Sequence, residues 1–395
     1  MRIYFDNAAT TPMDHRVYLA MEPYLKEKFG NASSLHLFGL EAKSAIDDSQ
    51  LTISNYLNCE TGEVFFTSGA TESNNLAIFG NLGGLKKLNV NLKPHIIISA
   101  IEHEAVLEPL KKLVKAGFDI TFLKANSNGL IQISELEKSI KRNTALISIM
   151  YANNEIGTIQ PIAEIGKLLS RLNIKRKNKI YFHTDATQAA PYLSMDVKKL
   201  GVDMLSFSGH KIYGPKGIGV LYLKKGTPYE PQFFGGQQQN SIRPGTFNTP
   251  GIVGIAKAVE IISNKKNLQS ENERLLKLRN YLLSKIKAKI QRISFNGDID
   301  KRIPSNLSVI FEGVEGESAL LMLSQKGIAV STGSACSTGS LEPSHVLCAI
   351  GIKPELAHGS IRFSFGRFNN KKEIDVLMKY LPDIISKLRK MSPLK

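Results

Sequence analysis

Cysteine is scarce in this sequence, and long apolar runs are missing. Three cysteines in 395 residues are too few and too scattered for a disulfide framework, and they form no Cys-x-x-Cys pair for zinc. No stretch approaches the roughly 20 apolar residues that cross a bilayer. Residues 1–6 resemble neither a signal peptide nor an Arg- and Ser-rich transit peptide. These absences predict a cytoplasmic chain with reduced thiols.

Acidic residues are outnumbered, since 35 Asp and Glu face 51 Lys and Arg and give a formal net charge of +16. Such an excess can indicate nucleic-acid binding. The basic residues, however, fall in short clusters such as Lys86-Lys87 and Lys175-Arg176-Lys177, without the interleaved aromatic residues of a stacking platform. We interpret them as solvated surface charge, which could steer an acidic protein or tRNA. We do not expect direct nucleic-acid binding.

Apolar runs alternate with helical patterns through the first two-thirds of the chain. The runs are typical of buried parallel strands and cover residues 64–66, 95–99, 145–150, 180–183, 204–207 and 219–223. Helical patterns lie between several of them, for example at 105–116 and 162–172. Alternation of this kind predicts an α/β domain with a mostly parallel sheet.

The pattern changes after Gly251. A long helix is predicted there, with Leu275 and Leu282 on its apolar face, and a smaller strand-and-helix unit follows it. A chain of this length exceeds a single core, so two domains are expected. We predict a large domain at residues 15–260 and a small α+β domain at residues 1–14 and 261–395.

Polar clusters follow several of the predicted strands at their carboxyl ends, where open α/β sheets collect ligands. The first cluster, Thr67-Ser68-Gly69-Ala70-Thr71-Glu72, precedes a helix. Glycine allows close backbone approach, and a helix N-terminus attracts phosphate. The cluster therefore predicts either a phosphate site or a simple capped turn.

A second cluster, residues 183–188, contains His183 and Asp185. The His-x-Asp pair could ligate a metal, but no further ligand cluster accompanies it. A carboxylate at a strand end would suit a cationic ring nitrogen. The alternative is that Asp185 caps a helix.

The third cluster, residues 206–211, places Ser208, His210 and Lys211 directly after a strand. A hydroxyl, an imidazole and a lysine at such a point suit a Schiff base beside a phosphate. An isolated lysine is most often a surface group. Lys211 is a candidate only because Ser208 and His210 lie beside it in the sequence.

The fourth cluster surrounds Cys336. Residues 331–340 otherwise hold serine, threonine, glycine and alanine, a composition that cannot pack a core and predicts an exposed loop. An exposed thiol of this kind can be a nucleophile or an incidental surface group, and the loop alone leaves both alternatives open. Cys59 and Cys348 lie in apolar contexts and are predicted to be small core residues.

Taken together, these motifs resemble those of the cysteine desulfurases, members of the class V aminotransferase family of fold-type I pyridoxal-phosphate enzymes. The resemblance runs from Phe5 to Leu394 and rests on five motifs in order. They are residues 67–73, Asn153-Asn154-Glu155-Ile156-Gly157, Asp185-Ala186-Thr187-Gln188, residues 206–211 and Gly333-Ser334-Ala335-Cys336. The long cysteine loop resembles the branch that serves iron–sulfur assembly and tRNA thiolation. The resemblance implies a large domain with a seven-stranded, mostly parallel sheet and a smaller α+β domain.

The resemblance also implies roles for individual residues. Lys211 would carry the cofactor, Asp185 would pair with its ring nitrogen, and His103 would stack on the ring and move a proton. Arg362 would clamp the substrate carboxylate and Cys336 would accept the sulfur. Asn154 would contact both substrate and cofactor. The cofactor-binding set would be Ala70, Thr71, His103, Asn154, Asp185, Gln188, Ser208, His210, Lys211 and, from a partner subunit, Thr246.

The implied activity is transfer of sulfur from L-cysteine to Cys336, with release of L-alanine. The implied partners are a second copy of the chain and persulfide acceptors such as an iron–sulfur scaffold or a tRNA-thiolation enzyme. No resident metal is expected, although Cys336 could contact an iron–sulfur cluster transiently. The alternatives are a selenocysteine lyase, a class V aminotransferase, or a catalytically dead sulfur-relay scaffold. An aminotransferase would not need Cys336.

Overall fold

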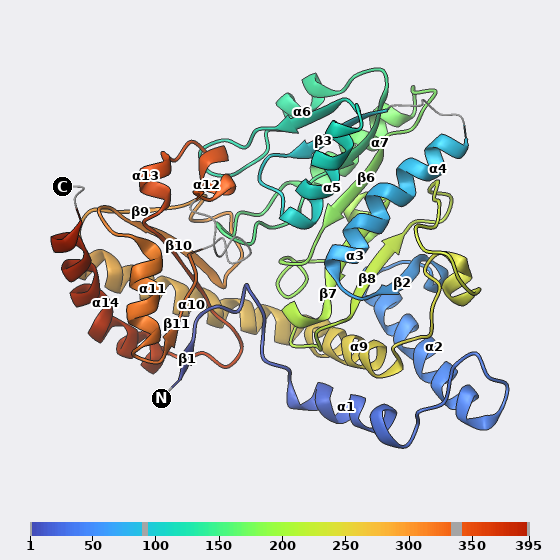
Figure 1. The fold of residues 1–395 in the computed structure, drawn as a ribbon, viewed down its shortest axis with the longest axis horizontal. Coiled ribbons are helices and arrows are strands. Elements are labelled where there is room, and N and C mark those ends of the chain that lie inside the picture. Colours follow the sequence, from blue (N-terminus) through green and yellow to red (C-terminus); the bar gives the residue numbers. More distant parts are fainter. Residues whose placement is uncertain (1, 89–93, 333–341, 393–395) are drawn as a thin grey trace.

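The computed structural model describes residues 2–88, 94–332 and 342–392. Figure 1 shows two units, a larger one built on a broad sheet and a smaller one that contains the segments next to both chain ends. The larger unit places helices on both faces of its sheet, as expected for an α/β architecture.

Within the described residues, the large sheet has seven strands in the order β2-β8-β7-β6-β5-β3-β4. Their bounds are β2 Val64–Thr67, β3 His95–Ser99, β4 Ile120–Leu123, β5 Thr144–Ser148, β6 Tyr181–Asp185, β7 Met204–Ser208 and β8 Gly219–Leu223. Strand β8 runs antiparallel to both of its neighbours, and the other pairs are parallel. The mostly parallel sheet predicted from the sequence is confirmed, with β8 as the reversed strand.

Alternate residues of these strands face two separate buried clusters, as the period of two in a strand requires. Ile97, Ile147 and Phe182 lie in one cluster, whereas Ile96 and Leu146 lie in the other. Both faces of the sheet are therefore covered, which explains why the strands read as continuous apolar runs.

Helices of the larger unit cover these faces. They are α1 His15–Lys26, α2 Leu37–Leu57, α3 Ala70–Asn75, α4 Asn81–Lys87, α5 Glu104–Lys115, α6 Ile133–Ser139, α7 Ile162–Asn173, α8 Val197–Leu200 and α9 Thr249–Ser263. A π-helical turn at Leu76–Gly80 joins α3 to α4 into one continuous helix. This helix begins at Ala70, shortly after β2 ends at Thr67.

The smaller unit has its own sheets and a third buried cluster. Its elements are β1 Ile3–Tyr4, α10 Lys265–Lys289, β9 Ile293–Phe295, β10 Asn306–Phe311, α11 Gly316–Ser324, β11 Ile328–Ala329, α12 His345–Ala349, α13 Pro354–Ala357, β12 Ser360–Ser364 and α14 Lys371–Met391. Strand β1 pairs with β11, and Ile3 and Phe5 share the cluster with α10, α11 and α14. The division at 15–260 stays a proposal. The third cluster supports it, whereas Val346 and Leu347 of α12 and Ala357 of α13 pack in a cluster of the larger unit.

The single long helix predicted after Gly251 is instead two helices. Asn264 separates α9 from α10 with an extended backbone (ψ 110°), and its side chain accepts a hydrogen bond from Asn267 N. Asparagine favours such capping positions, so it begins a new helix where the apolar pattern alone reads as continuous.

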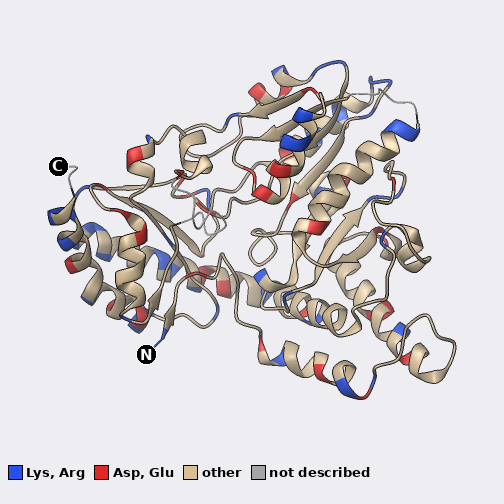
Figure 2. Ribbon diagram, viewed as in Figure 1, with Lys and Arg blue, Asp and Glu red and all other residues tan. Residues whose placement is uncertain are grey.

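Figure 2 shows lysines and arginines spread over the outer helices of both units. Several of them form exposed ion pairs within one helix, such as Lys111 with Glu108 in α5. Among the described residues, no helix is long and apolar enough to cross a membrane.

Candidate active site

A cavity of about 580 Å³ lies at the carboxyl ends of the sheet strands. This volume suits a cofactor or a small ligand. Ten of the twelve site residues predicted from the sequence line it, namely Ala70, Thr71, His103, Asn154, Asp185, Gln188, Ser208, His210, Lys211 and Arg362. Thr246 does not line the cavity, and Cys336 lies outside the described residues. Their roles remain proposals.

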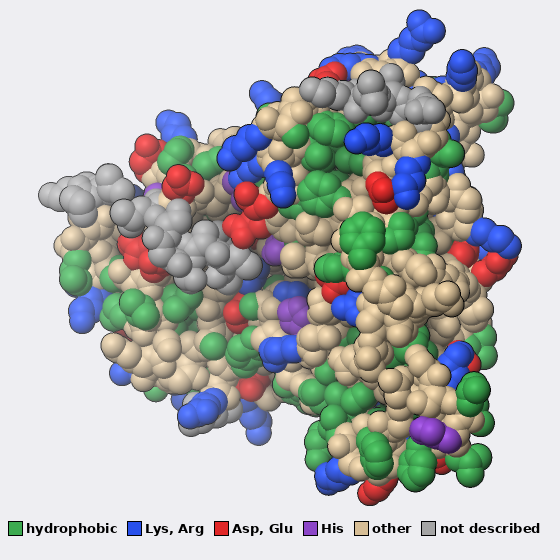
Figure 3. Space-filling view, turned by 45° about the vertical axis from the view of Figure 1, so that its right-hand side comes forward, with side chains coloured by type: hydrophobic (Ala, Val, Ile, Leu, Met, Phe, Trp, Pro, Cys, Tyr) green, Lys and Arg blue, Asp and Glu red, His purple; other side chains and the backbone are tan. Residues whose placement is uncertain are grey.

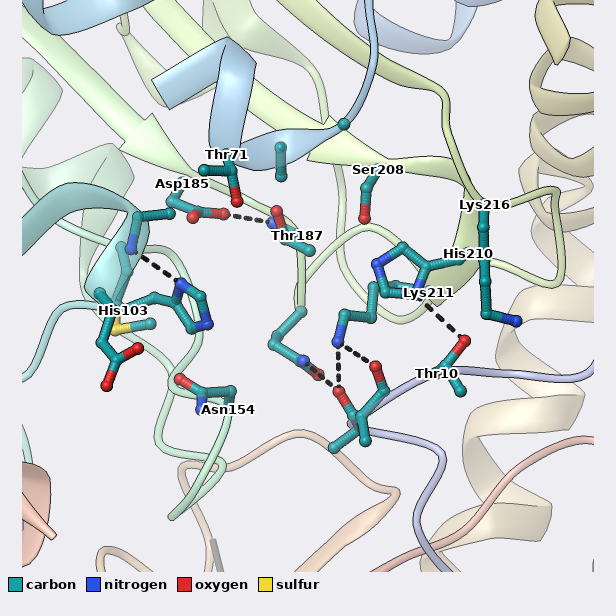
Figure 4. A pocket seen from close by; sticks show the side chains of 18 of the residues that line it. Thr10, Thr71, His103, Asn154, Asp185, Thr187, Ser208, His210, Lys211 and Lys216 are labelled. Atoms are coloured by element: carbon teal, nitrogen blue, oxygen red, sulfur yellow. Dashed lines mark hydrogen bonds between the residues drawn. The ribbon is translucent and has the colours of Figure 1, made fainter. Parts of the chain in front are cut away.

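Asp185 ends β6 and is buried. Its Oδ2 accepts a hydrogen bond from Asn74 Nδ2 at 2.7 Å, and its Oδ1 accepts one from Thr187 N at 2.9 Å (Figure 4). Neutral donors hold both carboxylate oxygens in place. A carboxylate held in this way offers negative charge to a cationic group in the cavity.

The turn after β2 and the end of β7 form the part of the cavity wall next to Asp185 (Figure 4). A side chain at Gly219 would bring its Cβ within 2.6 Å of the Gly69 carbonyl carbon, so glycine allows the start of β8 to approach this turn. Ser208 Oγ and Thr187 Oγ1 are buried and have no hydrogen-bond partner among the described residues. Buried hydroxyls of this kind usually have a partner, so both fit contacts to a polar ligand.

Lys211 follows β7, and the N-terminal segment holds its amine. Lys211 Nζ donates to Ala8 O at 2.7 Å and to Ala9 O at 2.6 Å. Gln188 Nε2 donates to the same Ala8 carbonyl at 2.9 Å. Figure 4 shows the Lys211 amine turned toward this segment, between Thr10 and the centre of the cavity. Two carbonyl oxygens favour the charged ammonium.

Two histidines flank the cavity. His103 precedes α5, and its Nδ1 accepts a hydrogen bond from Ala105 N at 3.1 Å, so the proton of the neutral ring lies on Nε2. His210 Nδ1 lies 3.1 Å from Thr10 Oγ1. Burial, together with the charges of Lys211 and Lys216, lowers the pKa of His210 to about 4. His210 is therefore neutral at pH 7.

Arg362 lies in the middle of β12 and is 2% exposed, so it is not a strand-edge surface group. Its NH1 donates to Asn154 O at 2.8 Å, and its NH2 pairs with Asp6 Oδ1 at 2.7 Å. The guanidinium is thus fixed from both sides, by the N-terminal segment and by the segment after β5. A fixed guanidinium at a cavity wall is suited to a carboxylate ligand.

The sequence analysis missed two buried carboxyl groups, Glu155, which lines the cavity, and Glu102, which does not. Burial raises the pKa of Glu102 and of Glu155. Glu102 Oε1 accepts from Met150 N at 2.6 Å, and Glu155 Oε2 accepts from Ser344 Oγ at 2.5 Å. Their neighbour His345 contacts the Glu102 carbonyl oxygen through Nε2 at 2.9 Å. These contacts join the cavity wall to the start of α12.

Other contributors were missed as well, among them Asp6, Thr10 and Asn74. The resemblance includes the first two, because it begins at Phe5, but no spacing rule predicts that backbone carbonyls accept hydrogen bonds from a lysine. One prediction about cysteines is wrong, because Cys348 is exposed on α12. Cys59 is half-buried beside the large cluster, and burial raises the pKa of its thiol to about 12.

The cavity therefore combines a lysine amine, a fixed carboxylate and a polar cradle at a strand–helix turn. These groups fit pyridoxal phosphate, because Ser208 and Thr187 leave buried hydroxyls for polar contacts and Asp185 offers charge to a ring nitrogen. Arg362 adds a site for a carboxylate. The arrangement can hold an amino acid beside an electron-withdrawing cofactor and move its protons.

Comparisons with known proteins agree with this geometry. The model of the aminotransferase class-V family matches residues 3–377. Cysteine desulfurase IscS of Dictyoglomus turgidum is 48% identical over 393 residues, which cover 100% of this chain and 97% of the relative. A solved NifS-like protein superposes with a TM-score of 0.89 at 37% identity, covering 98% of this chain and 100% of that chain. A structure described as SspA in complex with cysteine has a TM-score of 0.80 at 36% identity, covering 94% and 100%.

Proposed function

This chain belongs to the class-V aminotransferase family and, within it, to the cysteine desulfurases, and on that premise we propose that it moves sulfur from L-cysteine to Cys336. Its cofactor is pyridoxal phosphate. The balanced reaction joins L-cysteine and the Cys336 thiol to give L-alanine and a Cys336 persulfide. The substrate C–S bond breaks, a new S–S bond forms on the protein, and protons fill the free valence on the product carbon.

Pyridoxal phosphate, when bound, withdraws electrons from the carbon atoms of an amino acid attached to it. Asp185 supports that withdrawal by keeping negative charge next to the ring nitrogen. Lys211 supplies the amine that carries the cofactor and can take a proton from the substrate α-carbon. His103, which also lines the cavity, would exchange a proton with the substrate through Nε2.

The remaining residues position the ligands. Thr71, Ser208 and the neutral His210 surround the proposed phosphate position, together with Ala70. Gln188 and Asn154 lie between this position and Arg362, which would grip the substrate carboxylate. The observation that carries the proposal is the meeting of Lys211, Asp185 and Arg362 in one cavity.

Arg362→Lys tests this assignment. The cofactor-loaded wild-type protein should release alanine from L-cysteine. The variant should need at least about tenfold more cysteine for half-maximal rate, a loss of roughly 1.4 kcal/mol, because an ammonium cannot form two parallel hydrogen bonds with a carboxylate. Alanine formation measured against cysteine concentration gives both kcat and KM.

Arg171→Lys is the matched control, since Arg171 is an exposed arginine paired with Glu137 away from the cavity. Its KM for cysteine should equal that of the wild type. An unchanged KM in Arg362→Lys would assign the carboxylate to another residue. If the wild-type protein released no alanine from cysteine, the proposed function itself would be wrong.

A homodimer follows from the proposed contribution of Thr246 to a partner's phosphate position. A group of large apolar side chains is exposed around the start of α2 and on a loop after β8. It comprises Phe29, Leu35, Leu37, Phe38 and Phe234. Figure 3 shows hydrophobic side chains gathered at the lower end of the molecule, where α1 and α2 meet. Patches of this kind usually mark interfaces.

Leu37→Asp should weaken that dimer, because it places a charge in an apolar interface. We expect sedimentation velocity to show a dimer for the wild type and a monomer with little activity for the variant. Ile174→Asp is the control, since Ile174 is equally exposed at the end of α7 and should leave the dimer intact. A fully active wild-type monomer would contradict this proposal.

The partners beyond cysteine are persulfide acceptors, for example an iron–sulfur scaffold or a tRNA-thiolation enzyme, and we propose a cytoplasmic location. The name of the relative from Dictyoglomus turgidum and the cysteine complex of the SspA structure support cysteine as the substrate. The large positive charge of the chain would favour acidic acceptors over basic ones.

A further inference from the structure

A second cavity lies away from the proposed active site, between α10 and the loop that joins β9 to β10. Its volume is about 410 Å³. Arg279 from α10 and Arg302 from the loop line it, and they are 5% and 4% exposed. Arginines are rarely buried without a partner of opposite charge. Two of them in one cavity therefore need an explanation.

Neither arginine has an ion-pair partner among the described residues. Arg279 reaches the side chain of its neighbour Asn280 through Nε and NH2, both at 3.2 Å from Oδ1. Arg302 donates from Nε to Asp298 O at 2.6 Å and from NH2 to Asn296 O at 2.5 Å. These carbonyl contacts hold the loop, and the carboxylates of Asp298 and Asp300 offset the positive charge only in part, from beyond ion-pair distance.

Unused hydrogen-bonding groups point to a ligand. Arg302 NH1 is buried and donates to no atom in the described part of the chain. Asn272, which also lines the cavity, has a buried Oδ1 that accepts from no described residue. A buried donor or acceptor without a partner costs free energy comparable with a lost hydrogen bond, and this cavity contains one of each.

The electrostatics of the cavity agree with this geometry. Burial, followed by the charge of Arg279, lowers the pKa of Arg302 to about 10, although Asp298 and Asp300 act in the opposite direction. The acidic residues at this cavity, Glu273 and Asp300, are exposed, and neither lies within ion-pair distance of the arginines. Glu273 instead accepts a hydrogen bond from Gln269. An anion seated between the arginines would supply the missing charge.

We propose that this cavity is a binding site for a phosphate group, held by Arg279 and Arg302 with Asn272 as an acceptor. Hydrogenphosphate matches the two kinds of unused group, because its oxygens accept from guanidinium N–H groups while its O–H can donate to an amide oxygen. The cavity has room for more than the phosphate group, and Leu268, Leu276 and Pro304 line it with apolar surface. A small phosphorylated molecule therefore fits better than a bare ion.

The loop that carries Arg302 also braces the wall of the proposed active site. Arg302 forms a β-bridge with Thr158, and Ile303 N donates to Gly157 O at 3.0 Å. Asn306 Nδ2 donates to Glu155 O at 3.1 Å. The loop that carries the phosphate site is thus hydrogen-bonded to the segment next to Asn154, although the site is a separate cavity.

Inorganic phosphate is the probe for this site. The cofactor-loaded protein should be titrated with phosphate by calorimetry, with acetate and chloride at matched ionic strength in parallel. We expect saturable binding of phosphate, and we expect Arg279→Gln and Arg302→Gln to raise its Kd by at least about tenfold. Asp300→Asn should lower the Kd, because it removes a negative charge beside the ligand.

Arg171→Gln is the matched control, since it removes one exposed positive charge far from the cavity and should leave the Kd unchanged. Visible absorption recorded during the titration shows whether phosphate displaces the cofactor instead. Binding that is absent, matched by chloride or acetate, or equal in all variants would overturn the proposal. Asp300→Asn keeps the test decisive if the arginine variants do not fold. The readout is binding, so it is independent of cysteine turnover.

Discussion

Cys336→Ser should stop alanine release while leaving cysteine binding intact. The variant keeps Lys211, His103 and Arg362, so the cofactor should bind and the visible spectrum should still change when cysteine is added. Transfer of sulfur should fall by about a hundredfold or more, because a neutral hydroxyl is a far weaker nucleophile than a thiolate. Rapid-mixing spectra and alanine assays measure the two effects separately.

Cys348→Ser is the control that this chain offers for the cysteine variant. Cys348 is an exposed thiol on α12, and it should be dispensable for alanine release. Mass spectrometry should find an added sulfur atom at position 336 in the wild type and in Cys348→Ser, but not in Cys336→Ser. Near-normal alanine production by Cys336→Ser would refute the sulfur-transfer role, since an aminotransferase needs no such thiol.

Lys211→Ala should abolish both the covalent attachment of the cofactor and the reaction with cysteine. The lysine supplies the amine and a proton acceptor, so its removal should lower alanine formation by roughly a thousandfold. Borohydride reduction followed by peptide mass analysis should locate the cofactor on Lys211 in the wild type and nowhere in the variant.

Lys216→Ala separates a specific role of Lys211 from a general need for positive charge. Lys216 lines the same cavity, and Figure 4 shows it to one side of His210 and Lys211. This variant should keep the covalently bound cofactor. The assignment of Lys211 would be wrong if the cofactor stayed covalently attached in Lys211→Ala, or if the attachment were lost only in Lys216→Ala.

The sequence predicted the parts of the site that are contiguous in the chain. Asp185 and Ser208 end apolar strands, whereas Thr71 and Lys211 follow a strand end within four residues. The topology of the sheet brings such positions to one edge. A local pattern and one topological rule were therefore sufficient. The comparisons confirm the family and the cofactor that the five motifs indicated.

Contacts between distant segments could not be predicted in this way. Asp6 meets Arg362 across 356 residues, and the partners of Lys211 are carbonyl oxygens that any residue type could supply. The sequence pattern also missed β4, because this edge strand is only partly buried and carries no continuous apolar run. Cys348 was misplaced because α12 has five residues, too few for helical periodicity to separate its faces.

The N-terminal segment imposes an order of events on the biosynthesis of this protein. Strand β1 pairs with β11, Asp6 with Arg362, and Asn7 with Ser364 and Asn369. Asp6 thus waits for a partner that is made 356 residues later, a delay on the order of tens of seconds at ordinary rates of translation. The strands of the large sheet would leave the ribosome before β11 and β12, which hold the N-terminal segment. Ala8 and Ala9 can therefore be fixed against Lys211 only later. The cavity is consequently completed only after β12 has been made, and stable cofactor loading should follow that step.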